Sequence, residues 1–215
     1  MVKIIPAILT SDVGELLELL KRCEDVADRV QVDIIDGVFA ENKTIDPSVL
    51  ANLDLNLSLE FHLMVKEPKN WVERCARAGA DSIVGQIEMM SSQQEFVGRV
   101  QEVGAYVGLA IDLATQVSAL DEAILNNLDS VLVMSVKAGF GGQEFDRKVL
   151  SKIQKLDEIR SRDTTPFSII DDGGVTMEAV DDARRVGVDE IVVGKRLFEG
   201  DLKTNIEKFT KAAYK

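Results

Sequence analysis

Cysteine and histidine are scarce in this sequence. Its 215 residues include two cysteines, Cys23 and Cys75, and a single histidine, His62. The cysteines form no C-x-x-C pair and both lie in helix-like stretches, which disfavours a disulfide framework. We therefore expect two buried thiols and a reducing, cytoplasmic environment.

Long apolar runs and an excess of basic residues are also missing. No run approaches the roughly 18–20 apolar residues that cross a membrane, and residues 1–6 lack the apolar core of a signal peptide. The 25 Lys and Arg residues against 37 Asp and Glu residues give a net charge of -12. Nucleic acid and anionic membranes attract basic proteins, so we expect neither as a partner. A small anionic ligand remains compatible, because local donors outweigh a distant field.

Eight short runs rich in Val, Ile and Leu are spread along the chain, and helix-like stretches separate most of them. The runs barely alternate with polar residues, as expected for parallel strands buried on both faces. The runs are Lys3–Leu9, Arg29–Ile34, Leu57–Met64, Ser82–Ile87, Tyr106–Ile111, Ser130–Ser135, Phe167–Ile170 and Glu190–Val193.

This alternation fits either an open α/β sheet or a closed barrel. The G-x-G-x-x-G and Walker loops that are typical of nucleotide-binding open sheets are absent. The length of 215 residues suits one small barrel, since the fold needs roughly 200–250 residues. The sequence therefore predicts a single TIM (β/α)₈ barrel over residues 1–215.

The predicted helices have recognisable ends. A helix is expected over Asp12–Ala27, with Asp12 or Ser11 as its N-cap. Glycines that would terminate helices in the left-handed conformation stand at Gly79, Gly104 and Gly187.

Glycine is concentrated after the sixth, seventh and eighth runs, where TIM barrels commonly bind phosphate. Such glycines let backbone N–H groups approach an anion closely. The alternative is that they only form tight turns. We predict a phosphate site whose residues are Gly141, Gly142, Gly174, Gly194, Lys195 and Lys137.

Two aspartates close the second and seventh runs, on opposite sides of the predicted barrel. Asp33 and Asp172 could remove a proton from one face of a substrate carbon and return one to the other face. With His62 they also offer three ligands suited to Zn²⁺, Mn²⁺ or Fe²⁺. The alternative is that they cap loops or pair with lysines. Further candidates for the substrate pocket are Thr10, Met64, Gln86 and Met134, of which the methionines fit a plain core equally well.

At these residues the sequence resembles the ribulose-phosphate 3-epimerase family over Pro6 to Phe198. The resemblance implies a TIM barrel and epimerisation at C3 of a ketose phosphate, with a divalent metal held by two His and two Asp. It places the acid–base pair at Asp33 and Asp172, and one metal-binding histidine at His62. The matching segments are Pro6–Leu9, Val32–Gly37, Phe39 with Asn42, His62–Val65, Ala78–Asp81, Met134–Val136, Gly139–Gln143 and Asp172–Val175.

The sequence also departs from the family pattern. The second metal-binding histidine of the family falls at Gln31, whose amide is a poorer partner for Zn²⁺ than imidazole. A histidine on the fourth strand falls at Gln86, and one after the Asp-Gly pair falls at Val38. The phosphate-binding serine of the eighth strand falls at Lys195. Asn-Pro before the Gly-Phe-Gly-Gly loop is Lys137-Ala138, and serines of the first loop fall at Ala7 and Thr10.

Three hypotheses follow. The chain is an epimerase of a ketose phosphate with a weakened or rebuilt metal site that includes Gln31, or a catalytically altered homologue with another sugar phosphate, or a non-enzymatic binder of phosphorylated ligands. A related decarboxylase group is disfavoured because its D-x-K-x-x-D lysine is absent between Asp33 and Asp36. The resemblance also implies a homo-oligomer, a dimer or a hexamer.

Overall fold

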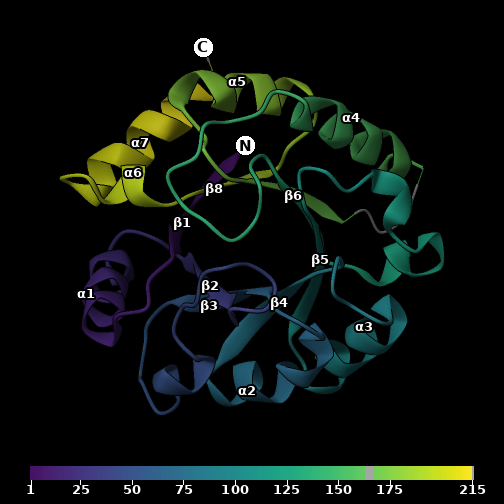
Figure 1. Ribbon diagram of the computed structural model, residues 1–215. Helices are drawn as coiled ribbons and strands as arrows, with labels where there is room; N and C mark the ends of the chain where they lie inside the picture. The colour runs from purple at the N-terminus through teal and green to yellow at the C-terminus, as the bar shows by residue number, and fades with distance from the viewer. Residues whose placement is uncertain (163–166, 215) are drawn as a thin grey trace.

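A computed structural model describes residues 1–162 and 167–214, and its strands form a closed parallel barrel in the order β1 to β8 (Figure 1). Each strand is hydrogen-bonded to the strands before and after it in the chain, and β1 pairs with β8. The strands are β1 Lys3–Ile8, β2 Arg29–Ile35, β3 Ser58–Met64, β4 Ala80–Gln86, β5 Tyr106–Ile111, β6 Ser130–Met134, β7 Ser168–Asp172 and β8 Glu190–Val193. The predicted TIM barrel is confirmed.

Helices surround the barrel and bury its outer face (Figure 1). They are α1 Val13–Glu24, α2 Val72–Arg77, α3 Gln93–Glu102, α4 Val149–Arg160, α5 Met177–Arg185, α6 Lys195–Phe198 and α7 Leu202–Ala212. Shorter 3₁₀ turns cover Pro47–Leu50, Pro68–Asn70, Val117–Ala119 and Glu122–Asn127. The last two turns stand in the connection from β5 to β6.

The predicted helix ends are largely confirmed. Asp12 is the N-cap of α1, where its carboxylate accepts a hydrogen bond from the Glu15 amide at 2.8 Å. The helix ends at Glu24, three residues before the predicted end at Ala27. The three expected glycines all have positive φ, namely Gly79 at 81°, Gly104 at 78° and Gly187 at 105°.

The buried apolar residues form two clusters, one between sheet and helices and a smaller one that includes Ile5, Met64 and Ile170. Polar side chains interrupt the smaller cluster because alternate residues of a strand share a face. Along β2 this face carries Arg29, Gln31 and Asp33, spaced two residues apart. The barrel interior therefore holds a column of polar groups, and its upper end forms the site described below.

Candidate active site

A cavity of about 620 Å³ opens at the carboxyl ends of the strands. Asp33 and Asp172 line it, and so do the glycine-rich loops after β6, β7 and β8. This is the end of a TIM barrel at which active sites are built, because the βα loops converge there.

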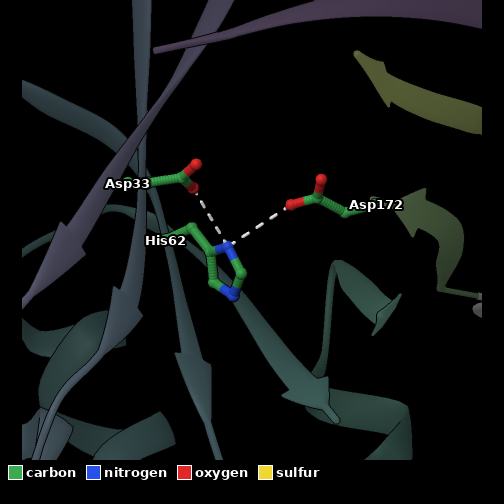
Figure 2. A group of neighbouring side chains, drawn as sticks. All are labelled: Asp33, His62 and Asp172. Atoms are coloured by element: carbon green, nitrogen blue, oxygen red, sulfur yellow. Dashed lines mark hydrogen bonds and ion pairs between the residues drawn. The ribbon is translucent and has the colours of Figure 1, made fainter. Parts of the chain in front are cut away.

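Four polar side chains meet at this end of the barrel interior (Figure 2 shows three of them). The His62 ring nitrogen Nδ1 lies 3.2 Å from Asp33 Oδ1 and 3.5 Å from Asp172 Oδ2. The Gln31 amide nitrogen donates to the same two oxygens, at 2.9 Å and 2.8 Å. Strand pairing explains why Asp33 and His62 lie close together, because Asp33 of β2 is directly beside His62 of β3 in the sheet. The two carboxylates are thus joined by an amide and an imidazole.

The second ring nitrogen of His62 faces Gln86 on β4. With the Gln86 amide oriented so that all its partners are satisfied, Oε1 accepts from His62 Nε2 at 3.1 Å and the amide nitrogen donates to Glu88 at 2.7 Å. This bond assigns a proton to Nε2 and directs Nδ1 towards the two carboxylates.

The surroundings of this group favour bound protons. Burial by itself would lower the pKa of His62, but the hydrogen bonds to Asp172 and Asp33 raise it to about 10. Burial raises the pKa of Asp33, and the nearby Asp172 carboxylate adds to that rise. Both shifts favour the protonated forms of His62 and Asp33 over their deprotonated forms.

The donor set is suited to a divalent metal. One ligand atom each from Asp33, His62 and Asp172 lies within 4.8 Å of the others, and all three residues are buried. Gln31 points its N–H groups at the carboxylates and leaves its oxygen Oε1 buried, without a hydrogen-bond partner among the described residues. A half-turn of the amide about its last bond would present that oxygen as a fourth ligand.

The loops predicted to bind phosphate lie side by side along the cavity. Gly174 has φ of 61°, and a Cβ there would stand 2.6 Å from the Phe145 amide nitrogen. The loop after β7 therefore packs closely against the loop after β6. The predicted residues that line the cavity with Gly174 are Gly141, Gly142, Gly194 and Lys195.

Other predicted residues lie in different places. Met64 and Met134 line the cavity. Lys137 is exposed and is not among the lining residues. Thr10 is buried, and its hydroxyl donates to the Glu15 carboxylate. Gln31, His62 and Gln86 are fully buried beneath the cavity.

Two residues beside the cavity were missed by sequence reasoning. Arg196 directly follows Lys195, and its guanidinium donates to two carbonyl oxygens of the loop after β7. Ser135 follows β6, and its hydroxyl contacts the carbonyls of Asp172, the last residue of β7, and of Gly173 in the same loop. A second cation next to Lys195 was the only sequence signal for Arg196. Contacts of side chains with a distant backbone leave no pattern in a single sequence.

The barrel and its buried Asp–His–Asp group define a TIM-barrel protein with an acid–base centre at the carboxyl ends of its strands. The chain belongs to the ribulose-phosphate 3 epimerase family, whose sequence profile matches residues 3–198. It is thus an enzyme of the isomerase class, an epimerase.

Curated relatives match almost end to end. The chain is 31% identical to a ribulose-phosphate 3-epimerase of Bacillus subtilis (strain 168), which covers 97% of this chain and 98% of the relative. It is 33% identical to one of Treponema pallidum (strain Nichols), covering 97% and 96% respectively.

Solved structures share the fold at low identity. A 3-hexulose-6-phosphate synthase from Salmonella typhimurium superposes with a TM-score of 0.68 at 15% identity, covering 98% of both chains. A tryptophan synthase alpha-subunit from Pyrococcus furiosus gives 0.71 at 15% identity, covering 97% of this chain and 98% of the other. No helix in the described part of the chain has the length and apolar character needed to span a bilayer.

Proposed function

We propose that this chain epimerises a ketose phosphate at C3, with D-ribulose 5-phosphate as the first substrate to test. The observation that carries the proposal is the pair of carboxylates, Asp33 and Asp172, at the floor of a cavity whose other side is lined by glycine loops. The loops would hold the phosphate. The carboxylates would face the reacting carbon from its two sides.

We assign to Asp33 and Asp172 the removal of one proton from C3 and the delivery of another to the same carbon. One carboxylate removes the proton from C3 while the other, protonated, delivers a proton to the opposite face. The C3–H electron pair moves into the enediolate as the first bond breaks, and it forms the new C–H bond. His62 and Gln31 hold both carboxylates in place through the bonds described above.

A divalent metal fits this site, and we assign Asp33, His62 and Asp172 as its ligands with Gln31 as the fourth, weaker one. Such an ion, Zn²⁺, Mn²⁺ or Fe²⁺, would supply Lewis-acid stabilisation of the negative charge on the substrate oxygens. The amide in place of a second imidazole supports weak retention of the metal.

Proton exchange in deuterated water tests the function. Proton NMR should show deuterium entering C3 of D-ribulose 5-phosphate when Zn²⁺ or Mn²⁺ is supplied. Asp33→Asn and Asp172→Asn should each reduce the rate by roughly 10²–10⁴-fold, while Asp54→Asn, at an exposed position, should match the unmodified chain.

Two results would replace this proposal with another. Absence of exchange under all metal conditions, together with binding of the sugar phosphate, would indicate a phosphate-ligand binder. Exchange on a different sugar phosphate alone would indicate a catalytically altered homologue.

The assembly and the compartment belong to the same proposal. The free, buried thiols of Cys23 and Cys75 suit a reducing cytoplasm, and we expect a homo-oligomer, a dimer or a hexamer. Size-exclusion chromatography with light scattering measures the oligomeric state directly.

A further inference from the structure

Side chains on two sides of the loop that connects β7 to α5 hydrogen-bond to its backbone carbonyls. On one side the buried Ser135 hydroxyl lies 3.0 Å from the Asp172 carbonyl oxygen and 2.7 Å from that of Gly173. On the other side the Arg196 nitrogen Nη1 donates to the carbonyl oxygens of Gly174 at 2.9 Å and Val175 at 3.1 Å. The Ser135 backbone amide also donates to the Asp172 carbonyl at 2.7 Å, which leaves the hydroxyl proton for Gly173. The four successive carbonyls from Asp172 to Val175 therefore have donors from outside the loop.

These hydrogen bonds affect how the β7–α5 loop can bind an anion. Peptide units are planar and trans, so a carbonyl and the N–H group of the next residue point in opposite directions. Fixing the Gly174 and Val175 carbonyls on Arg196 therefore also restricts the orientation of the Val175 and Thr176 amides. The positive guanidinium also offsets the partial negative charge of these carbonyl oxygens, which would otherwise repel a phosphate oxygen.

Arg196 retains donor capacity after making these bonds. A guanidinium has five N–H groups, and only Nη1 is engaged with carbonyls. Among the described residues, Nε and Nη2 make no hydrogen bond or ion pair, although the side chain lines the cavity.

The charges around the cavity make this cation important. The acidic lining residues are Glu15, Asp33, Asp172 and Glu199, whereas Lys195 and Arg196 are the two cations among the lining residues described. The whole chain carries a net charge of -12. A dianion that enters this cavity is therefore attracted mainly by the two neighbouring cations at the start of α6.

We propose that Arg196 is the positioning and specificity residue for the phosphate group, and that it acts by holding the β7–α5 loop while presenting its remaining N–H groups to the anion. This inference rests on the proposed function, since it takes the ligand to be a phosphate ester. Ser135 fixes the other half of the same loop.

Titration calorimetry with D-ribulose 5-phosphate and with D-ribulose tests the role of Arg196. Arg196→Ala should weaken binding of the phosphate ester by roughly 10–100-fold and leave D-ribulose binding unchanged. Arg196→Lys should recover only part of the loss, because one ammonium cannot reproduce the planar fork. Arg99→Ala removes the same charge from α3, where the arginine pairs with Glu95, and should behave as the unmodified chain.

Two further readouts separate positioning from general damage. In turnover assays, Arg196→Ala should raise KM by a similar factor while kcat stays within about threefold. Hydrogen exchange at the amides of residues 173–176 should become faster in Arg196→Ala than in the unmodified chain, and Arg99→Ala should keep the rate of the unmodified chain.

The results that overturn the proposal are distinct from those that overturn the function. If the unmodified chain turns over the ester and Arg196→Ala binds it as tightly as Arg99→Ala does, the inference is wrong and the function stands. Full recovery by Arg196→Lys also overturns it, because charge alone would then suffice. If no form binds the ester, the proposed function and the ligand role fail together. Unchanged exchange at residues 173–176 in Arg196→Ala would then discard the positioning role as well.

Discussion

Single residues in this barrel carry unusual chemistry, and Asp171 is the clearest case. It is fully buried on β7 beside Asp172, and neither carboxylate oxygen has a hydrogen-bond partner among the described residues. Burial raises the pKa of its carboxyl group to about 8. The folded chain therefore keeps this group neutral at pH values where the unfolded chain ionises it.

The consequence is a cost in stability that grows with pH. Between the usual pKa of 3.8 and about 8, folding requires uptake of a proton, so stability falls as pH rises. Asp171→Val should raise the free energy of unfolding at pH 7 by roughly 1–3 kcal/mol. Urea unfolding at pH 5 and pH 8 measures it: the gain should be larger at pH 8. A gain that is equal at both pH values contradicts the assignment.

Gln31 is the second residue at which one side chain decides a property of the site. Its amide nitrogen bridges the two carboxylates, at 2.9 Å and 2.8 Å. Gln31→His would replace this amide with an imidazole ligand and should raise Zn²⁺ affinity by roughly 10–100-fold. Competition with a chromogenic chelator measures the affinity. Equal affinity in the two forms would show that Gln31 does not occupy a ligand position.

At the level of secondary-structure elements, the loop after β7 and the loop after β6 pack against each other at Gly174. Gly174 has a left-handed conformation, and a Cβ there would meet the Phe145 amide nitrogen at 2.6 Å and the Gln143 carbonyl oxygen at 2.7 Å. Backbone atoms cannot move aside as the end of a flexible side chain can. The β7–α5 loop can therefore approach the β6–α4 loop only with glycine at this position.

Gly174→Ala should displace the two loops and weaken binding of the sugar phosphate by more than about tenfold, since strain of 1–2 kcal/mol adds to the clash. Gly98→Ala is the matched control, because a Cβ there meets nothing within 4 Å in the middle of α3. That change should instead stabilise the chain by roughly 0.5–1 kcal/mol. Calorimetric titration and thermal unfolding of both variants distinguish these outcomes. Wild-type ligand affinity in Gly174→Ala would show that the loops tolerate separation.

The sequence patterns predicted the existence of the strands more accurately than the boundaries of the helices. The apolar runs predicted all eight strands, because parallel strands buried on both faces leave an uninterrupted apolar signal. The connection from β5 to β6 forms 3₁₀ turns over Val117–Ala119 and Glu122–Asn127. Pro68 begins a 3₁₀ turn and the helix proper begins at Val72, a boundary that propensity alone does not resolve.

At the scale of the whole molecule, the opposite end of the barrel holds an ion cluster whose two carboxylates are buried and whose lysine is exposed. Arg29 contacts Glu190 and lies 3.7 Å from Glu60, while Lys3 lies 3.8 Å from Glu190. Burial raises the pKa of Glu60, and Arg29 opposes that rise. Strands β2, β3 and β8 are thus joined by the partly buried Arg29 guanidinium and two buried carboxylates.

Arg29→Met should lower the free energy of unfolding by roughly 3–5 kcal/mol at pH 7, because two buried carboxylates lose their partner. This loss in the free energy of unfolding should become smaller as pH falls, since burying a protonated carboxyl costs less free energy than burying a carboxylate. The triple variant Arg29→Met, Glu60→Gln, Glu190→Gln should recover most of the loss. Urea unfolding from pH 5 to pH 8 checks both statements. A deficit that does not depend on pH would contradict the role of the charges.

The amino-acid sequence was sufficient to predict the barrel, the strand ends and the residues Asp33, His62 and Asp172 that meet there, because strand order and period 2 place them on one inner face. The contacts that join these groups became visible in the folded chain alone. The bridging amide of Gln31, the neutral Asp171 and the grip of Arg196 and Ser135 on one loop are contacts between distant segments. Such contacts depend on side-chain direction and on the distance between strands, which no local pattern encodes.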